Sequence, residues 1–270
     1  MNQPASVGVV YEHLERAKRT GPFITNFYPS QDKLQRWLDR GELFLNPLGD
    51  VLFVLRRDRD FLHLYYLASS AADLPAALDE LDASVRETTT VDILGKREQV
   101  APLAEKFLEA GFADLCALHR MTRLGDETRT AATADPQLVF ADKSDGNALA
   151  GMLETALDRF AEQIPDADEM ARAAADRKVL IIRSGTAIAG MLFYEVTGQS
   201  SLLRHWLVDP AHRDQRVGAR LMRRYFAECV DVRRFLLWVI SDNDNAIDRY
   251  KHYGYQQDGM IDQVMIRRPS

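Results

Sequence analysis

The residues best suited to chemistry lie in the segment at 207–222, which runs from an expected strand through a turn and a loop into an expected helix. The first N–H groups of a helix have no partner within the helix, and the helix dipole places positive charge at the same end. Gly218 lets a ligand approach the backbone, and Arg213 and Arg216 can form paired hydrogen bonds to phosphate oxygens. The segment predicts a site for a phosphate or pyrophosphate, with an ordinary strand-to-helix turn and solvated arginines as the alternative.

A second segment, at 241–255, carries an amide and a phenol on one face of an expected helix. Asn243 follows an apolar run, and Tyr250 comes seven residues later, nearly two helical turns on. The Asn243 amide could hold the amide groups of a long cofactor arm, and the Tyr250 hydroxyl could donate a proton. Each residue also has a structural alternative, as a helix cap for Asn243 and as a core residue for Tyr250.

The elements that must position these segments follow the apolar spacing of the second half of the chain. Expected strands cover 138–140, 179–182, 188–196, 201–208, 235–240 and a last stretch ending near 266, and expected helices cover 148–160, 169–176, 217–230 and 246–253. The run at 235–240 is typical of a strand buried on both faces. The order is β-α-α-β-β-β-α-β-α-β, which indicates an α/β (α+β) domain.

The first half follows a similar order, with a hairpin at 50–55 and 61–67, helices at 74–85 and 100–109, and strands at 91–94 and from 111 to 121. A single offset of about 143 residues places Gly111 on Gly254 and the strand at 61–67 on the strand near 204–210. We interpret this as an internal duplication, as against a chance similarity of two α/β halves. The stretch at 125–136 has few large apolar groups, so we place domains at 1–125 and 137–270 and a linker at 126–136.

The composition, with 46% apolar and 27% charged residues, is that of a soluble globular protein. No apolar stretch reaches the roughly 18 residues that a membrane helix needs. Residues 1–6 show no basic region followed by an apolar core, so we expect no secretory signal. The formal charge of −6 argues against nucleic-acid binding. Two distant cysteines provide too few soft ligands for a zinc site, so we expect no metal and a cytoplasmic, reducing location.

Together, the two segments resemble the GNAT superfamily of N-acyltransferases. The family's loop, Arg/Gln-x-x-Gly-x-Gly/Ala before a helix, is similar to the run from Arg213 to Gly218, after a Val-x-Pro-like turn at 208–210. Its later segment, Asn-x-x-Ala-x-x-x-Tyr-x-x-x-Gly-Phe, is similar to 243–255, with a tyrosine in place of the final phenylalanine. The resemblance covers about 136–268. One departure is Arg216, which replaces the first loop glycine and so loses that residue's easy access to positive φ.

The resemblance implies two GNAT-like domains, each a mixed, mostly antiparallel sheet flanked by helices. It implies acetyl-CoA as the cosubstrate, with another acyl-CoA or an acyl group on a carrier protein as alternatives. The residues implied to hold coenzyme A are Leu207, Val208, Arg213, Asp214, Gln215, Arg216, Val217, Gly218, Ala219, Asn243 and Ala246. Among them, the backbone at 207–208 would pair with the pantetheine arm, and the loop at 213–219 would hold the pyrophosphate.

The implied reaction is direct attack of a primary amine on the thioester, with Tyr250 protonating the leaving thiolate. The base remains open among Glu195, His205 and Asp209. The acceptor would be a small-molecule or peptide amine. The region at 160–176 carries acidic residues that could attract a cationic amine, although a solvated helix face is the favoured interpretation.

The first half is interpreted as a degenerate copy that lacks the cofactor loop. The offset places Phe107 at the position of Tyr250 and Val100 at that of Asn243, and the connection at 68–73 has neither glycine nor arginine. The alternative function is a non-catalytic tandem scaffold that binds acyl-CoA or another small molecule. The sequence leaves the oligomeric state open.

Overall fold

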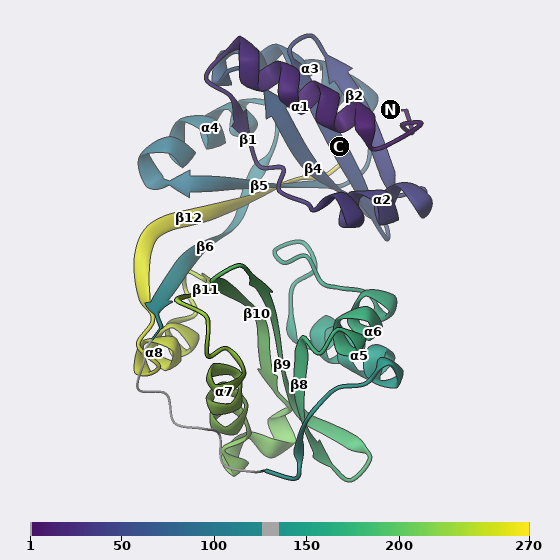
Figure 1. Ribbon diagram of the computed structural model, residues 1–270. Coiled ribbons are helices and arrows are strands. Elements are labelled where there is room, and N and C mark those ends of the chain that lie inside the picture. The colour runs from purple at the N-terminus through teal and green to yellow at the C-terminus, as the bar shows by residue number, and fades with distance from the viewer. Residues whose placement is uncertain (1, 126–134, 270) are drawn as a thin grey trace. The chain divides into compact units, whose positions relative to one another are not determined.

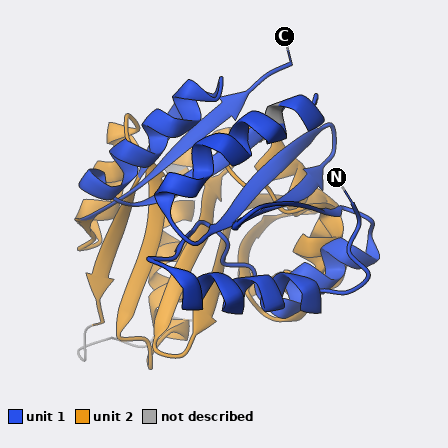
Figure 2. Cartoon of the chain, turned by 90° about the horizontal axis from the view of Figure 1, so that it is seen from above, with its two compact units in different colours: residues 1–118, 259–270 blue, residues 119–258 orange. Residues whose placement is uncertain are grey.

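A computed structural model describes residues 2–125 and 135–269, and the chain divides into two compact units. The first unit contains Met1–Leu118 and Gly259–Ser270, and the second contains His119–Asp258 (Figure 2). This division differs from the expected domains at 1–125 and 137–270, because it runs within two strands, β6 after Leu118 and β12 before Gly259. Residues 119–125 thus join the second unit, and the residues from Gly259 onward join the first. The expected linker falls mostly on 126–134, outside the described residues.

The first unit is a sheet with the strand order β2-β3-β4-β5-β12, in which β4 and β5 are parallel and the other neighbours are antiparallel (Figure 1). Its elements are α1 (Gly8–Thr20), β1 (Ile24–Thr25), α2 (Gln31–Asp39), β2 (Leu43–Leu48), β3 (Val51–Asp58), β4 (Phe61–Ala68), η1 (Ala71–Asp73), α3 (Leu74–Ser84), β5 (Thr89–Lys96), α4 (Arg97–Glu109) and β6 (Ala113–Leu124), with β12 (Gln256–Arg267) from the far end of the chain. The elements before residue 50 were not expected from the sequence.

Helices cover both faces of this sheet. Leu78 of α3 and Phe107 of α4 pack on one face, and Leu34 and Trp37 of α2 pack on the other. Alternating side chains of β3 reach both clusters, which explains why its first five residues are buried and all apolar.

The parallel strands β4 and β5 separate along their length. Their pairing covers Leu62–Leu64 against Thr89–Val91, although β4 continues to Ala68 and β5 to Lys96. Backbone groups beyond the paired region therefore need partners from elsewhere in the chain.

Asn26 supplies several of those partners. Its side chain is 4% exposed, and its Nδ2 donates to the carbonyl of Leu64 at 3.1 Å and to the carbonyl of Asp92 at 2.8 Å. Its Oδ1 accepts from the N–H of Tyr66 at 2.7 Å. Just before it, β1 pairs antiparallel with the end of β4. The segment at 24–26 therefore fills the space between the separating strands.

The helical segment that follows β4 begins with residues that disfavour the binding of an anion. Ser70 and Asp73 form a capping box in which the Asp73 carboxylate accepts the N–H of Ser70 at 2.9 Å. Pro75 stands in the first turn of α3 and has no N–H to offer. The start of α3 thus carries a negative charge and lacks one backbone donor.

The second unit has the strand order β6-β11-β10-β9-β8-β7, with β10 and β11 parallel. Its elements are β7 (Leu138–Phe140), η2 (Lys143–Asp145), α5 (Gly146–Ala156), α6 (Ala167–Ala175), β8 (Val179–Ser184), β9 (Ala187–Thr197), β10 (Ser200–Val208), η3 (Pro210–Gln215), α7 (Val217–Glu228), β11 (Arg234–Ile240) and α8 (Asp244–His252). The helix expected at 148–160 ends earlier, because Leu157 is already extended.

In this unit α7 and α8 cover one face and α5 and α6 the other (Figure 1). The prediction that the strand at 235–240 is buried on both faces is wrong for one face. Phe235, Leu237 and Val239 are buried under α7 and α8, whereas the residues between them are half-buried. The cluster under α5 and α6 covers β8 and β9 but includes no residue of β11.

The two units repeat one local structure at the offset of about 143 residues. Gly111 and Gly254 follow α4 and α8 with φ of +81° and +82°, a region that favours glycine. The N–H of Phe112 bonds to the carbonyl of Phe107 at 2.9 Å, and the N–H of Tyr255 bonds to the carbonyl of Tyr250 at 3.1 Å. The same helix ending thus precedes β6 and β12, which supports the duplication and the alignment of Phe107 with Tyr250.

Candidate functional site

The site is built where β10 turns into α7. Asp209 follows the strand, and its Oδ1 accepts the N–H of Ala211 at 2.8 Å. Arg216 stands directly before α7 with φ of +54°. The expectation that an arginine at this position would not adopt a positive φ is therefore wrong. The loop keeps the left-handed turn that a glycine would adopt at no steric cost, and the arginine bears the strain.

This turn leaves the first backbone donors of α7 unpaired within the helix. The N–H of Arg220 is bonded to the carbonyl of Arg216 at 3.0 Å, and the N–H groups of the three preceding residues have no acceptor inside the helix. With the positive end of the helix dipole, these donors can bind an anion.

The parallel strands β10 and β11 separate as β4 and β5 do. In the described residues their register joins Ser200–Leu203 to Arg234–Leu237, after which β10 runs on to Val208. A register shift between Leu203 and His205 marks an irregularity in β10 at this point. Leu207 and Val208 pair with β9 on one side, so the opposite edge of β10 is open to a ligand with amide groups.

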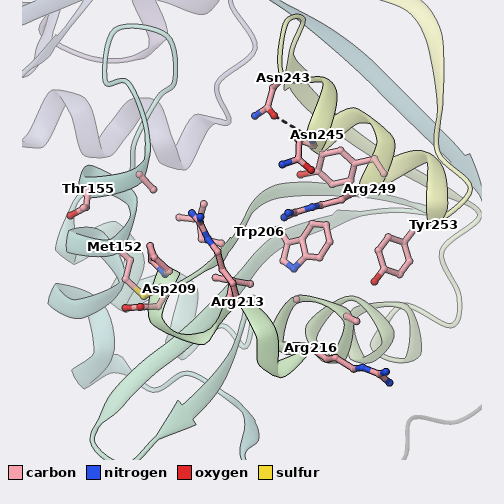
Figure 3. A pocket seen from close by; sticks show the side chains of 18 of the residues that line it. Met152, Thr155, Trp206, Asp209, Arg213, Arg216, Asn243, Asn245, Arg249 and Tyr253 are labelled. Carbon is pink, nitrogen blue, oxygen red and sulfur yellow. Dashed lines mark hydrogen bonds between the residues drawn. The ribbon is translucent and has the colours of Figure 1, made fainter.

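A cavity of about 1320 Å³ lies beside this strand edge, between α5, the end of β10, the start of α7 and α8 (Figure 3). Of the residues predicted to bind or act on the cofactor, those lining it are Leu207, Val208, Arg213, Arg216, Gly218, Ala219, Asn243, Ala246 and Tyr250. The segments at 207–222 and 241–255, which are separate in the sequence, therefore contribute to one cavity.

The charged residues of the cavity are mainly basic. Arg213, Arg216 and Arg249 line it together with two aspartates, Asp209 and Asp248. Figure 3 shows Arg213 and Arg249 reaching toward the middle of the cavity and Arg216 extending away from them. The cavity thus has positive charge beside the N-terminus of α7, as a phosphate site requires.

Tyr250 lies on α8 at the wall of the cavity. Burial raises the pKa of its phenol, and the nearby charge of Glu162 raises it further. The ring lies 5.7 Å from the Trp206 ring and 5.9 Å from the Tyr255 ring, centroid to centroid. The phenol therefore keeps its proton throughout the neutral pH range and can donate it.

Trp206 was not predicted and explains the glycine at 218. A Cβ added to Gly218 would lie 2.9 Å from the Trp206 indole, so the nearest neighbour of this glycine is a side chain of the domain itself. The indole Nε1 is buried and makes no hydrogen bond among the described residues. Trp206 belongs to no recognisable motif, and only the fold shows that it lines the cavity.

The family can now be stated from a comparison of sequences. Residues 149–255 match the family model described as Acetyltransferase (GNAT) family. They form a GNAT domain. No curated protein matches the chain.

Solved structures extend the likeness to both units at low sequence identity, which concerns the fold alone. A Drosophila protein matches with a TM-score of 0.61 and 16% identity over 99% of this chain and 98% of its own. A tandem GNAT protein from the clavulanic acid biosynthesis pathway matches with a TM-score of 0.61 and 13% identity over 100% and 97% of the two chains. A GCN5-related N-acetyltransferase from Sphaerobacter thermophilus matches with a TM-score of 0.56 and 15% identity over 89% and 87%. The chain thus has the fold of two tandem GNAT-like units.

The remaining predicted cofactor residues of the GNAT domain lie away from the cavity or serve the fold. Val217 is 1% exposed and packs in the core, and Gln215 does not line the cavity. The side chain of Asp214 lies outside what the structure describes. Asn243 does cap α8, since its Oδ1 accepts the N–H of Ala246 at 3.1 Å, which leaves its Nδ2 as the group that could face a ligand.

Two of the three candidate bases, His205 and Glu195, do not line the cavity. His205 is 7% exposed on β10, and burial lowers its pKa to about 3, so its imidazole is neutral and weakly basic at neutral pH. Glu195 lies on β9 opposite Leu202. Asp209 lines the cavity but caps the turn with its carboxylate.

The acidic residues of 160–176 have mainly structural partners, as the favoured interpretation expected. Asp166 and Glu169 form the capping box of α6, and Asp176 pairs with Lys178 at 2.9 Å. Glu162 differs from them, because its side chain is only 22% exposed and lies 3.9 Å from the His205 ring, Oε2 to Nδ1.

Two further observations concern the described residues as a whole. None of their helices is long and apolar enough to cross a membrane. No group of three or more histidine, cysteine, aspartate or glutamate side chains among them is placed to hold a metal ion.

Proposed function

We propose that the GNAT domain transfers an acetyl or short acyl group from coenzyme A to a primary amine. The observation that carries this proposal is the joining, around one cavity, of the open edge of β10, the N-terminus of α7 and the Tyr250 phenol. Acyl transfer is the general activity of the family that residues 149–255 match.

The cavity fits acetyl-CoA by the chemistry of its walls. The N–H groups at the start of α7 and the Arg213 guanidinium suit a pyrophosphate. The backbone of Leu207 and Val208 suits the amides of a pantetheine arm, which would extend the sheet as a short strand would. The Asn243 Nδ2 supplies a further donor on the same wall.

The residues of the domain then have separate tasks in the reaction. When bound, acetyl-CoA supplies the reactive thioester. Leu207 and Val208 hold the arm in register, and Trp206 and Tyr253 exclude water beside it. Tyr250 keeps its proton at neutral pH and gives it to the departing thiolate, a general-acid step that requires its hydroxyl to reach the sulfur.

The alternative is a scaffold that binds acyl-CoA without chemistry, and release of free thiol distinguishes the two. The full-length protein would be mixed with acetyl-CoA and a panel of small primary amines, and coenzyme A would be detected with a thiol reagent. The proposal expects amine-dependent thiol release with at least one amine. Saturable acetyl-CoA binding with no amine-dependent release across the panel would support the scaffold.

We expect one acetyl-CoA site per chain, in the second unit. In the first unit the space between the separating strands holds Asn26, and the start of α3 has Asp73 and Pro75 in place of arginine and glycine. Calorimetric titration of the full-length chain should give a stoichiometry of one, and Arg213→Ala should weaken that single event about tenfold or more. Two binding events in the parent protein would contradict this assignment.

Arg216 provides a second test, because its backbone is strained and its side chain points away from Arg213. Arg216→Gly should raise the free energy of unfolding by about 1 kcal/mol and bind acetyl-CoA as well as the parent. Arg216→Ala, which keeps most of the strain, is the matched control for stability. If both variants bind acetyl-CoA more weakly than the parent at low salt and the difference shrinks at high salt, Arg216 contacts a phosphate.

A further inference from the structure

Glu162 is a carboxylate that no motif indicates. Its charge acts on the Tyr250 phenol, and it is not among the residues that line the cavity. It lies in the connection between α5 and α6, where a turn around Asp158 holds it. The carbonyl of Asp158 accepts the N–H of Glu162 at 2.9 Å, and its Oδ1 accepts the N–H of Phe160 at 2.9 Å. Ala161 and Ile164, on either side, are buried. The backbone at 162 is therefore fixed by bonds and by packing.

The surroundings of Glu162 are drier than those of a surface carboxylate. Its Oε2 lies 3.9 Å from Nδ1 of His205, whose ring is neutral and almost wholly buried. The other ring nitrogen of His205, Nε2, has no hydrogen-bond partner among the described residues. The Glu162 carboxylate thus faces an imidazole that carries no positive charge to stabilise it.

Burial and the neighbouring charges place the pKa of the Glu162 carboxyl near neutral pH. Burial raises the pKa of its carboxyl to about 7, Arg204 on β10 lowers it, and Asp158 on the same connection raises it. The Glu162 charge is also felt by Tyr250 on α8, where it raises the pKa of the phenol. A carboxylate with this pKa can take a proton from an ammonium and release it to water at neutral pH.

We propose that Glu162 is the residue that accepts the proton of the acceptor amine. This inference rests on the proposed function. The Glu162 carboxylate takes one proton from the ammonium, and the freed nitrogen lone pair forms the C–N bond as the C–S bond breaks. Tyr250 gives its proton to the thiolate, and its phenolate takes the second proton from the nitrogen. Glu162 returns its proton to solvent, so one proton is released per turnover.

The first test needs no acceptor. The carboxyl carbons of glutamate would be labelled with ¹³C in the full chain and followed by NMR as the pH is raised. One resonance should titrate near pH 7, persist in Glu154→Gln and vanish in Glu162→Gln. Glu154 is an exposed glutamate on α5 and serves as the matched control. Titration of Glu162 in the ordinary glutamate range would overturn the inference, whether or not the protein acetylates amines.

The second test uses the amine that gives the fastest thiol release in the panel. In the parent, kcat/KM should fall as the pH drops through about 7, because the carboxylate becomes protonated. Glu162→Gln should lower kcat/KM at pH 7.5 by about 100-fold or more and abolish this dependence, whereas Glu154→Gln should keep both. Aniline, which is already neutral at this pH, should be affected less by Glu162→Gln.

Two outcomes decide between the possibilities. If Glu195→Gln removes the pH dependence and Glu162→Gln keeps it, the base is Glu195 and the inference is wrong. If no amine is acetylated although the Glu162 carboxyl titrates near pH 7, the proposed function fails and the inference falls with it. Thermal unfolding of the variant and the parent shows whether a loss of activity is due to unfolding. The folded state raises this pKa from 4.5 to about 7, so the carboxyl increasingly destabilises the fold as the pH rises between these values. Glu162→Gln should therefore melt no lower than the parent at pH 8.

Discussion

Tyr250→Phe should lower kcat for amine acetylation by about 100- to 1000-fold, within the range for loss of a general acid, and leave acetyl-CoA affinity nearly unchanged. The substitution removes one oxygen from a ring that packs against Trp206 and Tyr255, so the packing of α8 is retained. Burial raises the pKa of the Tyr250 phenol, and the parent therefore has its proton available throughout the neutral range. Thiol release under saturating acetyl-CoA and calorimetric binding measure the two quantities separately.

The same change at Tyr253 shows whether the loss belongs to position 250. Tyr253 presents a second phenol to the cavity but stands at the end of α8, where its N–H bonds to the carbonyl of Tyr250 at 3.0 Å. Tyr253→Phe should reduce turnover less than Tyr250→Phe does. If Tyr250→Phe turns over like the parent, with the chemical step shown to be rate-limiting, Tyr250 is a packing residue and the thiolate is protonated from elsewhere.

Asn26→Asp should lower the free energy of unfolding by roughly 3 kcal/mol, which is among the largest single effects expected in the first unit. The carboxylate would keep the shape of the side chain but lose both Nδ2 donors, and its oxygen would face the carbonyls of Leu64 and Asp92. Buried acceptors left without a donor cost more than a hydrogen bond contributes when it is made. Denaturant unfolding of the parent and the variant gives the difference.

Asn46→Asp is the matched control for this experiment. Asn46 lies on β2 and bonds through Nδ2 to the exposed Ser84 hydroxyl at 3.2 Å, so its loss should be small. In Asn26→Ala, hydrogen exchange should also quicken at the N–H of Tyr66, which bonds to the Asn26 Oδ1. Unchanged exchange at Tyr66 and equal stabilities of the variants at 26 and 46 would show that Asn26 does not hold the strands.

The cofactor-facing part of the site could be predicted because its functional residues lie close to one another in the sequence. The turn at 207–222 and the helix at 243–255 each place their functional residues within a few turns of one another, and local spacing suffices to find them. The backbone of Arg216 could not be predicted, because its left-handed conformation is imposed by the turn against the arginine's own preference.

The roles of Glu162 and Asn26 depend on contacts between distant segments. Asn26 meets the carbonyls of residues 38 and 66 positions away, and nothing near it in the sequence distinguishes it from an asparagine in a turn. Glu162 stands among several acidic residues, and only its position near His205 and Tyr250 sets it apart from those that cap α6 or pair at the surface. The pairing of β12 with β5 could not be predicted for the same reason.

The placement of residues 259–270 in the first unit has a consequence for how the protein is made. Residues Met260–Arg267 of β12 pair in register with Thr89–Lys96 of β5, so the sheet of the first unit lacks a strand while the ribosome is still making the second. Vectorial synthesis therefore does not let this N-terminal unit finish folding first, as N-terminal domains usually do. During that interval the edge of β5 is unpaired and open to strands of other nascent chains, a hazard that ends only when β12 emerges.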